Sequence, residues 1–511
     1  MGTRRGEQLH FSDGDTAVTV DLNHTYHWST GAPVTSKDVR FFFQILANQP
    51  LCYSFGDLLP KDITSATYTG TYAFTLHLDH AYNPLWLIEN QLQWITPLPV
   101  QAWDRTCGTC PVGNDATTPT GAKAVTNFLM SQFRTTAAYG TNPLWKVVNG
   151  PWQISAYNPV TKETSFVRNP HYTGPTKPHL SGFNIVSFTT GAAETDALRS
   201  GTLDMGFLTP SEYNEVPYFK SHGYRVIGWP IYGNNAVELG FTNPTYGPLV
   251  KQLYIRQALQ HLITEKLYIS KALHGFGQTD YGSLSVLAHA KVVSPVLRHV
   301  IYPYSPSTAK SLLTSHGWKM GKDGVDYCAQ PGTGAHQCGA GISSGKQLSL
   351  LFVYATGSTS TLAEVEAYVA AAKSVGVRLN LKGESLPTEE TQGECPPGPC
   401  DYGLMVEPGV LWTLGYQQGM PTGTEQFGPG AYYSGGYTSP KAFRLMKTAD
   451  SSPSTSFAPW YKMENYLSKD LASLWFPLTD AITVISPKLK GWSPLNPDTT
   501  YQPQFWYLTG K

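Results

Sequence analysis

The stretch VTVDLNHTYHWSTGAPVTSKDVRFFFQIL at residues 18–46 constrains the fold more than any other part of this 511-residue chain. Apolar and polar residues alternate at its start, with Val18, Val20 and Leu22 on one face. This period of two predicts a half-buried strand. Gly31 and Pro33 then break the extended chain, which predicts a turn.

A helix is expected directly after this turn. Thr35 stands three residues before Asp38, which is the spacing of a capping box, in which a hydroxyl and a carboxylate bind free backbone N–H groups at a helix start. Apolar residues then follow at helical spacing, at Val39, Phe42, Phe43 and Leu46. One face of the helix is therefore expected to be buried, and the order of strand, turn and capped helix indicates an α/β protein.

Further elements are predicted downstream. An amphipathic helix is expected near Ala124 to Phe133, and another over GAAETDALRS, where Gly201 suits a left-handed C-cap. The strand KQLSLLFVY, the helix LAEVEAYVAAAKSVG and the strand VRLNLKG form a βαβ-like unit. A stripe at Ile255, Ala258, Leu259 and Leu262 predicts a buried helix face.

Length and charge exclude some classes of protein. A chain of 511 residues exceeds one ordinary core, so two or three packed lobes are expected. Lys plus Arg and Asp plus Glu both total 36. The chain therefore has no excess of basic residues of the kind that nucleic-acid-binding proteins carry. No apolar run approaches the ~20 residues that a membrane helix needs.

The seven cysteines favour an oxidising compartment. Two pairs bracket short loops that a disulfide would close, namely Cys328 with Cys338 and Cys395 with Cys400. The compartment and these spacings together make both pairs disulfide candidates.

The CGTC at Cys107 and Cys110 has two interpretations. A thioredoxin-type pair with a depressed thiol pKa would make the chain a secreted thiol-redox enzyme. The pair lies in a loop rich in proline and glycine, which favours a structural disulfide instead. Cys52 is then left as a buried thiol.

No motif for catalysis or for a metal is found. The sequence lacks a GxSxG elbow, an HExxH helix and a GxxxxGK[ST] loop. Histidines recur at His24 and His27 and at His77 and His80, but in alternating sequence such residues point to opposite faces. We therefore expect no catalytic residue, no metal and no cofactor.

Four blocks of the sequence, in order along the chain, contain distinctive residues and do not repeat one another. The first block is residues 18–46, where the relevant residues are Trp28, Gly31, Pro33, Asp38 and Val39. The second block is NGPWQISAYNPVTKETSFVRNPHYTG, with Gly150, Pro151, Arg168, Asn169, Pro170 and Tyr172. The third block is YIRQALQHLITEKLYISKALHGFGQ, with Arg256, Gln257, Ala258 and Leu259. The fourth block runs from GGYTSPKAFRLM to FPLTDAITVISPKLKGW.

In content and order these blocks resemble the peptide- and nickel-binding class, family 5, of the extracytoplasmic solute-binding proteins that serve ABC importers. The resemblance implies an α/β fold built as a two-lobed hinged clamshell, periplasmic-binding-protein-like, of type II and cluster C, with a smaller accessory lobe. By this likeness residues 1–148 form the accessory lobe, 149–240 plus 471–511 the first large lobe, and 241–470 the second. Family members normally carry a signal sequence and an opening strand-rich segment before the first block; we expect both to be missing here, and the accessory lobe to be incomplete.

The implied function is binding without chemistry. The resemblance implies a monomeric extracytoplasmic protein, in the periplasm or at the surface of a bacterium, that captures a peptide or similar oligomeric solute in an inter-lobe cleft and delivers it to a membrane permease. The candidate ligand-binding residues are Tyr232, Asn235, Tyr281, Trp412 and Tyr416. Tyr and Trp suit the wall of a ligand-binding cleft because each has a large rigid ring and one polar group that can form a hydrogen bond. Each of these residues can equally be an ordinary core or surface residue.

One departure from the family affects the ligand. Peptide-binding members commonly place an Asp after a GW stretch of the second lobe, where it pairs with the α-ammonium of the peptide. Here no acid lies between Glu407 and Glu425. Either Glu407 substitutes, or the ligand is not a simple peptide, in which case an oligosaccharide stacked on Trp412, or a metal chelate, is the alternative.

Overall fold

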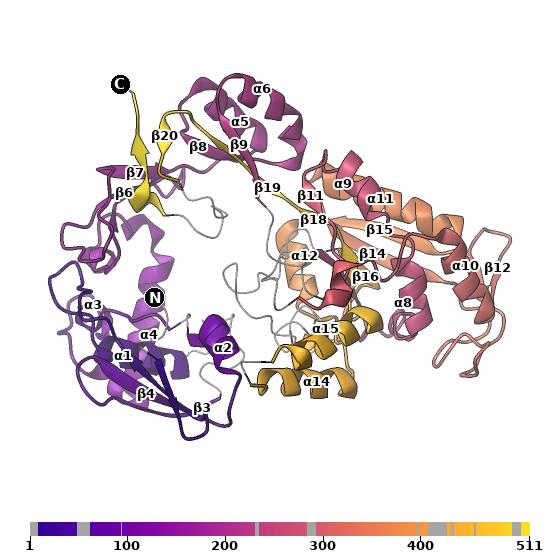
Figure 1. Ribbon diagram of the computed structural model, residues 1–511, viewed down its shortest axis with the longest axis horizontal. Coiled ribbons are helices and arrows are strands. Elements are labelled where there is room, and N and C mark those ends of the chain that lie inside the picture. The colour runs from indigo at the N-terminus through magenta and orange to yellow at the C-terminus, as the bar shows by residue number, and fades with distance from the viewer. Residues whose placement is uncertain are drawn as a thin grey trace. The chain divides into compact units, whose positions relative to one another are not determined.

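The computed structural model (Figure 1) describes residues 9–48, 62–92, 95–229, 235–283, 293–395, 398–406, 427–429, 431, 434–453, 456–492 and 502–510. The chain divides into two compact units: the first comprises Met1–Ala193 and Ser486–Lys511, and the second comprises Glu194–Ile485. The division into three lobes at residues 148, 240 and 470 stays a prediction.

An antiparallel sheet opens the first unit. Its strand order is β1, β2, β4, β3, with bounds Leu9–Ser12, Ala17–Asp21, Ala73–Leu78 and Ile63–Thr67. The predicted strand is β2, and the side chains of Val18 and Val20 are buried as the alternation requires. Helix α1 (Ser36–Asn48) follows the turn and is confirmed.

Asp38 anchors the start of α1, but not as a complete capping box. Its Oδ2 accepts hydrogen bonds from the backbone N–H of Thr35 at 2.8 Å and from the Thr35 hydroxyl at 3.1 Å. Because that hydroxyl donates to the carboxylate, the N–H of Asp38 donates to the Thr35 carbonyl at 3.0 Å instead. The other carboxylate oxygen accepts from the N–H of Val100 at 3.2 Å, so Asp38 also joins α1 to α3 (Val100–Trp103).

Helix α4 (Pro119–Arg134) packs against α1 and confirms the predicted helix near Ala124 to Phe133. It begins earlier than expected because the Thr118 side chain accepts the N–H of Gly121 at 3.1 Å and Pro119 occupies the first turn. Their shared core consists of Phe41, Ile45, Ala102, Trp103, Ala116, Ala122, Val125 and Phe128.

The rest of the first unit is built from short elements. A second antiparallel sheet has the order β5, β6, β7, with bounds Trp152–Tyr157, Thr164–Arg168 and Gly182–Ile185, and β20 (Leu489–Lys490) pairs with β21 (Tyr507–Leu508). The short helical turns are α2 (Pro84–Trp86), η2 (Leu87–Gln91), η4 (Asp115–Thr117), η5 (Thr136–Ala138), η6 (Pro143–Lys146) and η10 (Pro503–Phe505).

A five-stranded mixed sheet forms the centre of the second unit. Its order is β15, β14, β16, β10, β17, with bounds Arg378–Glu384, Ser349–Ala355, Leu404–Val406, Asn235–Leu239 and Leu474–Phe476. Strand β14 is parallel to β15 and β16, whereas β10 is antiparallel to β16 and β17. Helix α11 (Thr359–Ser374) joins β14 to β15 and packs on both (Figure 1), which confirms the βαβ unit.

A three-stranded antiparallel sheet also belongs to the second unit. Its order is β8, β19, β9, with bounds Met205–Leu208, Ala481–Ile485 and Arg225–Trp229. Helix α5 (Gly191–Ser200) precedes it and ends at Gly201, whose φ of 70° confirms the left-handed cap. The sheet packs with η7 (Pro210–Glu215) and α6 (Val216–Ser221) around Leu198, Leu208, Tyr213, Val216, Phe219, Ile482 and Val484.

One short run of chain contributes to three sheets. Strand β17 is an edge of the five-stranded sheet, β18 (Leu478–Thr479) pairs with β11 (Gly277–Gln278), and β19 is the central strand of the three-stranded sheet. Residues 474–485 therefore connect the sheets of the second unit directly.

Helices surround these sheets. Helix α8 (Leu253–Gln260) buries Ile255, Ala258 and Leu259 completely, and Leu262 just beyond it, which confirms the predicted stripe. The remaining elements are α7 (Gly247–Val250), α9 (Glu265–Lys271), η8 (Pro295–Arg298), α10 (Pro306–Ser315), β12 (Trp318–Met320), β13 (Asp326–Cys328), α12 (Leu386–Gly393), α14 (Pro440–Asp450) and α15 (Ala458–Asp470).

All three candidate cysteine pairs are disulfide-bonded. The bonds join Cys107 to Cys110, Cys328 to Cys338, and Cys395 to Cys400. Cys52 lies outside the described residues. Among the helices of the described ranges, none is long and apolar enough to cross a membrane.

We expect Asp38→Ala to lower the free energy of unfolding of the first unit by about 2–4 kcal/mol, because a buried carboxylate with several backbone partners is lost. Urea denaturation measures the change. Lys37→Ala, at the exposed neighbouring position, is the control and should change stability by less than about 0.5 kcal/mol. Equal effects of the two substitutions would show that Asp38 does not anchor the helix.

Candidate functional site

The structure describes two of the five predicted ligand-binding residues. Asn235 and Tyr281 both lie in the second unit. Tyr232, Trp412 and Tyr416 lie outside the described residues, as does Glu407.

Asn235 is the first residue of β10 and pairs in register with Phe476 of β17. Its side-chain Nδ2 donates a hydrogen bond to the carbonyl of Pro477 at 2.9 Å, which fixes the amide group. The amide Oδ1 is buried and has no hydrogen-bonding partner among the described residues. Because a buried unpaired acceptor is costly, this oxygen is suited to receive an N–H group of a ligand.

Tyr281 is partly exposed and belongs to a segment, residues 277–283, that is tied down at both ends. At one end, Gly277 and Gln278 form β11 and pair with β18. At the other, the N–H of Ser283 donates to the hydroxyl of Ser468 on α15 at 2.9 Å. These bonds give Tyr281 a fixed backbone position in the second unit.

Sequence reasoning missed the acidic pair beside these two residues. Asp280 directly precedes Tyr281, and its side chain is completely buried. Its backbone N–H donates to Oε2 of Glu265, the first residue of α9, at 2.9 Å. The backbone N–H groups of Asn235 and Gly282 lower the pKa of Asp280, but burial and the nearby Glu265 raise it more. The sequence gives no signal for this burial, since Asp280 stands in the polar context Gln-Thr-Asp-Tyr.

Two more buried acids flank the segment. The Nε2 of Gln278 donates to Oδ1 of Asp480 at 3.4 Å, and burial raises the pKa of Asp480. On the other side, Oε2 of Glu464 accepts the N–H of Ser294 at 2.8 Å, and burial raises the pKa of Glu464. The surroundings of Tyr281 are thus acidic and mostly shielded from water.

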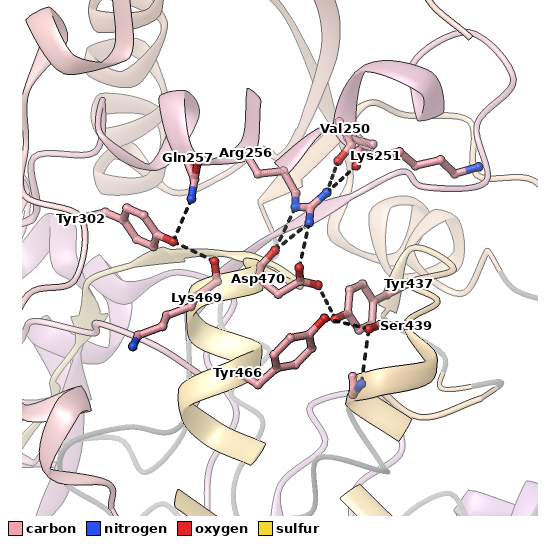
Figure 2. A network of polar contacts seen from close by, with 11 residues as sticks. Val250, Lys251, Arg256, Gln257, Tyr302, Tyr437, Ser439, Tyr466, Lys469 and Asp470 are labelled. Carbon is pink, nitrogen blue, oxygen red and sulfur yellow. Dashed lines mark hydrogen bonds and ion pairs between the residues drawn. The ribbon is translucent and has the colours of Figure 1, made fainter. Parts of the chain in front are cut away.

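A buried arginine network supports this region at the C-terminal end of α15, where Ser468 also lies (Figure 2). The guanidinium of Arg256 on α8 donates to the carbonyls of Val250 at 2.8 Å and Lys251 at 3.0 Å. It also donates to the carbonyl of Asp470 at 3.0 and 2.8 Å, and lies 3.5 Å from Oδ1 of that residue. The ring of Phe241 lies against the guanidinium, 5.5 Å from its centroid. Arg256 therefore fastens the start of α8 to the end of α15.

Tyr437 and Tyr302 extend this network. The Tyr437 hydroxyl donates to Oδ2 of Asp470 at 2.6 Å, so the carboxylate is held on both sides. The Tyr302 hydroxyl donates to the carbonyl of Lys469 at 2.7 Å and lies 3.4 Å from Nε2 of Gln257 (Figure 2). Asp470 is followed by Leu471 in the left-handed conformation, with φ of 51°, where α15 turns into β17.

The described residues supply polar and aromatic groups at this site. No group of three or more His, Cys, Asp or Glu side chains that could hold a metal ion is found among them. The groups at this point are an amide oxygen at Asn235 and a partly exposed aromatic ring at Tyr281, which together suit recognition of N–H groups and apolar surface.

Comparison with known families gives a match over most of the chain. The family described as "Bacterial extracellular solute-binding proteins, family 5 Middle" matches residues 7–395. Protein XP55 of Streptomyces lividans is 24% identical over 405 residues, which cover 79% of this chain and 63% of that protein. A putative ABC transporter peptide-binding protein of Brucella ovis is 26% identical over 316 residues, 61% of this chain and 51% of that protein. The chain thus spans between half and two thirds of the length of these relatives.

A solved structure shares the fold. The oligopeptide-binding protein AppA from Bacillus subtilis, in complex with a nonapeptide, superposes with a TM-score of 0.73. The two sequences are 17% identical, and the match covers 99% of this chain and 89% of AppA. This likeness confirms the predicted mixed α/β, periplasmic-binding-protein-like fold.

We expect Arg256→Ala to lower the free energy of unfolding of the second unit by about 3–5 kcal/mol, because it leaves the Asp470 carboxylate and several carbonyls without their buried partner. Denaturant unfolding followed by tryptophan fluorescence measures the effect. Arg444→Ala, which removes an exposed arginine of α14, should cost less than about 0.5 kcal/mol. A loss below about 1 kcal/mol in Arg256→Ala would mean that the network does not support the unit.

Proposed function

The chain belongs to the family 5 bacterial extracellular solute-binding proteins, and on this premise we propose that it is the substrate-binding component of an ABC import system. It captures a peptide or peptide-like solute outside the cytoplasm and delivers it to a membrane permease, without chemical change of the solute. The observation that carries this proposal is the family match over residues 7–395.

Two findings support a peptide as the solute. The Brucella ovis relative is a putative ABC transporter peptide-binding protein, and AppA was solved in complex with a nonapeptide. In this chain, the unpaired Oδ1 of Asn235 offers an acceptor for a backbone N–H of such a ligand. A peptide carries many N–H groups in a regular array, so an oriented amide is a suitable recognition element.

The proposed binding surface comprises Tyr232, Asn235, Tyr281, Trp412 and Tyr416. Asn235 fixes orientation through its amide, and the aromatic residues supply contact area at low entropic cost. Since no acid lies between Glu407 and Glu425, we propose that affinity comes from main-chain hydrogen bonds and aromatic contacts more than from a charge pair with the α-ammonium of the ligand. The working form is a monomer that meets its permease at the membrane.

Mixed synthetic peptides should raise the thermal unfolding temperature of the protein, because a ligand that binds the folded state alone stabilises it by about 2.7 kcal/mol at a hundredfold excess over Kd. In calorimetry with a peptide found this way, Asn235→Ala should weaken binding about tenfold, as expected for a lost hydrogen bond of about 1.4 kcal/mol.

Asn380→Ala is the matched control, since Asn380 is an exposed asparagine on β15 of the same sheet. It should leave the Kd unchanged. If no peptide stabilises the protein while an oligosaccharide or a metal chelate does, the peptide assignment is wrong and the binding role stands. If none of the three stabilises it, the proposed binding function itself fails.

A further inference from the structure

Glu265 and Asp280 form an acidic pair that is bound through one backbone contact. The N–H of Asp280 donates to Oε2 of Glu265 at 2.9 Å, which joins residues 277–283 to the start of α9. The Asp280 carboxyl is fully buried, and the N–H groups of Asn235 and Gly282 lie near it. Within the described part of the chain, neither carboxyl oxygen has a hydrogen-bonding partner of normal geometry. A carboxylate in such a position loses its hydration and gains little in return.

Among the residues that the structure describes, no cation compensates this pair. Among the ion pairs formed by the described residues, none includes Glu265 or Asp280. The lysines of α9, Lys266 and Lys271, are exposed to solvent. By contrast, the fully buried Asp326 has Lys310 at 2.9 Å. Asp280, which is fully buried, must therefore hold a proton in order to stay there. Glu265 beside it is only partly exposed, so its charged form is disfavoured as well.

The neighbouring titratable groups are acids as well. Asp480, which follows β18, reaches the segment through Gln278, and Glu464 of α15 lies beyond Ser283, whose hydroxyl donates to the Glu464 carbonyl at 3.3 Å. Glu364 of α11 faces Tyr268 on α9. Each charge that these groups gain on losing a proton is negative, so their titration adds to the repulsion.

The pKa values agree with this geometry. Burial raises the pKa of Glu265 to about 8. Burial, and after it the charge of Glu265, raises the pKa of Asp280 well above its ordinary value. The folded state therefore binds more protons than the unfolded chain above the ordinary carboxyl pKa of about 4. The stabilisation is complete below that pH and is lost as the pH rises through about 8.

We propose that Glu265 and Asp280 are a proton-dependent clasp, which holds residues 277–283 against α9 and β10 while both acids are protonated and releases them when both are charged. Release is local, because two like charges in one buried site separate most readily by moving the short segment between β11 and Ser283. The clasp does not depend on the identity of a ligand, and it is a pH response separate from the proposed binding function. It would make the position of Tyr281 sensitive to external pH.

Hydrogen exchange on the ligand-free, full-length protein tests the clasp. After correction for the intrinsic pH dependence of exchange, protection of the amides in residues 277–283 should fall at least about tenfold between about pH 6 and pH 9. Amides of β14 (Ser349–Ala355) are the internal reference and should keep their protection. An equal fall in both places would show global unfolding and would overturn the clasp.

Two variants decide the mechanism. Asp280→Asn and Glu265→Gln each imitate a protonated acid, so each should fold and should keep the segment protected within about twofold between pH 6 and pH 9. Glu389→Gln is the matched control, because it removes a buried acid of α12 whose pKa is also raised to about 8 and which lies outside the clasp and its acidic neighbours, and it should keep the tenfold fall. The proposal is overturned if the original chain shows no fall, or if Asp280→Asn and Glu265→Gln both retain it.

Discussion

The buried contact between Arg256 and Asp470 fixes where α15 ends and β17 begins. The positions of the described site residues depend on this contact. Four residues after Asp470, the chain enters β17, which pairs with β10 and so sets the position of Asn235. The same helix carries Ser468, which holds the segment of Tyr281. A guanidinium is suited to this task because its planar array of donors can satisfy several carbonyls and a carboxylate at once.

The buried acids of the second unit differ in whether a cation lies beside them. Arg256 and Lys310 neutralise Asp470 and Asp326. By contrast, the buried acids Asp280, Glu364 and Glu464 form no ion pair with any described residue. The charge state of those acids is set by protons instead of by partners. Only 14% of the residues of this chain are charged, so few lysines and arginines are present to pair with buried acids. Arg256 is one that does so, where α8 meets the end of α15.

Local patterns in the sequence predicted local structure well. The strand, turn and helix of residues 18–46, the βαβ unit and the short disulfide loops were all correct, because neighbouring residues determine each of them. The site was harder to predict. Asn235 was identified, but its partner Pro477 lies 242 residues away. Asp280 and Glu265 were missed, since their burial depends on packing among α9, β10 and β18 that no local pattern reveals.

The run of residues 474–485 has a consequence for how the protein is made. It supplies an edge strand to one sheet and the central strand to another, so neither sheet can be completed before this late part of the chain has been synthesised. Contacts that join such distant parts of a sequence form slowly. Until they form, β8 and β9 lack the strand that separates them, and their exposed edges are open to wrong pairing. The nascent protein therefore spends most of its synthesis in a state that must be kept from aggregating.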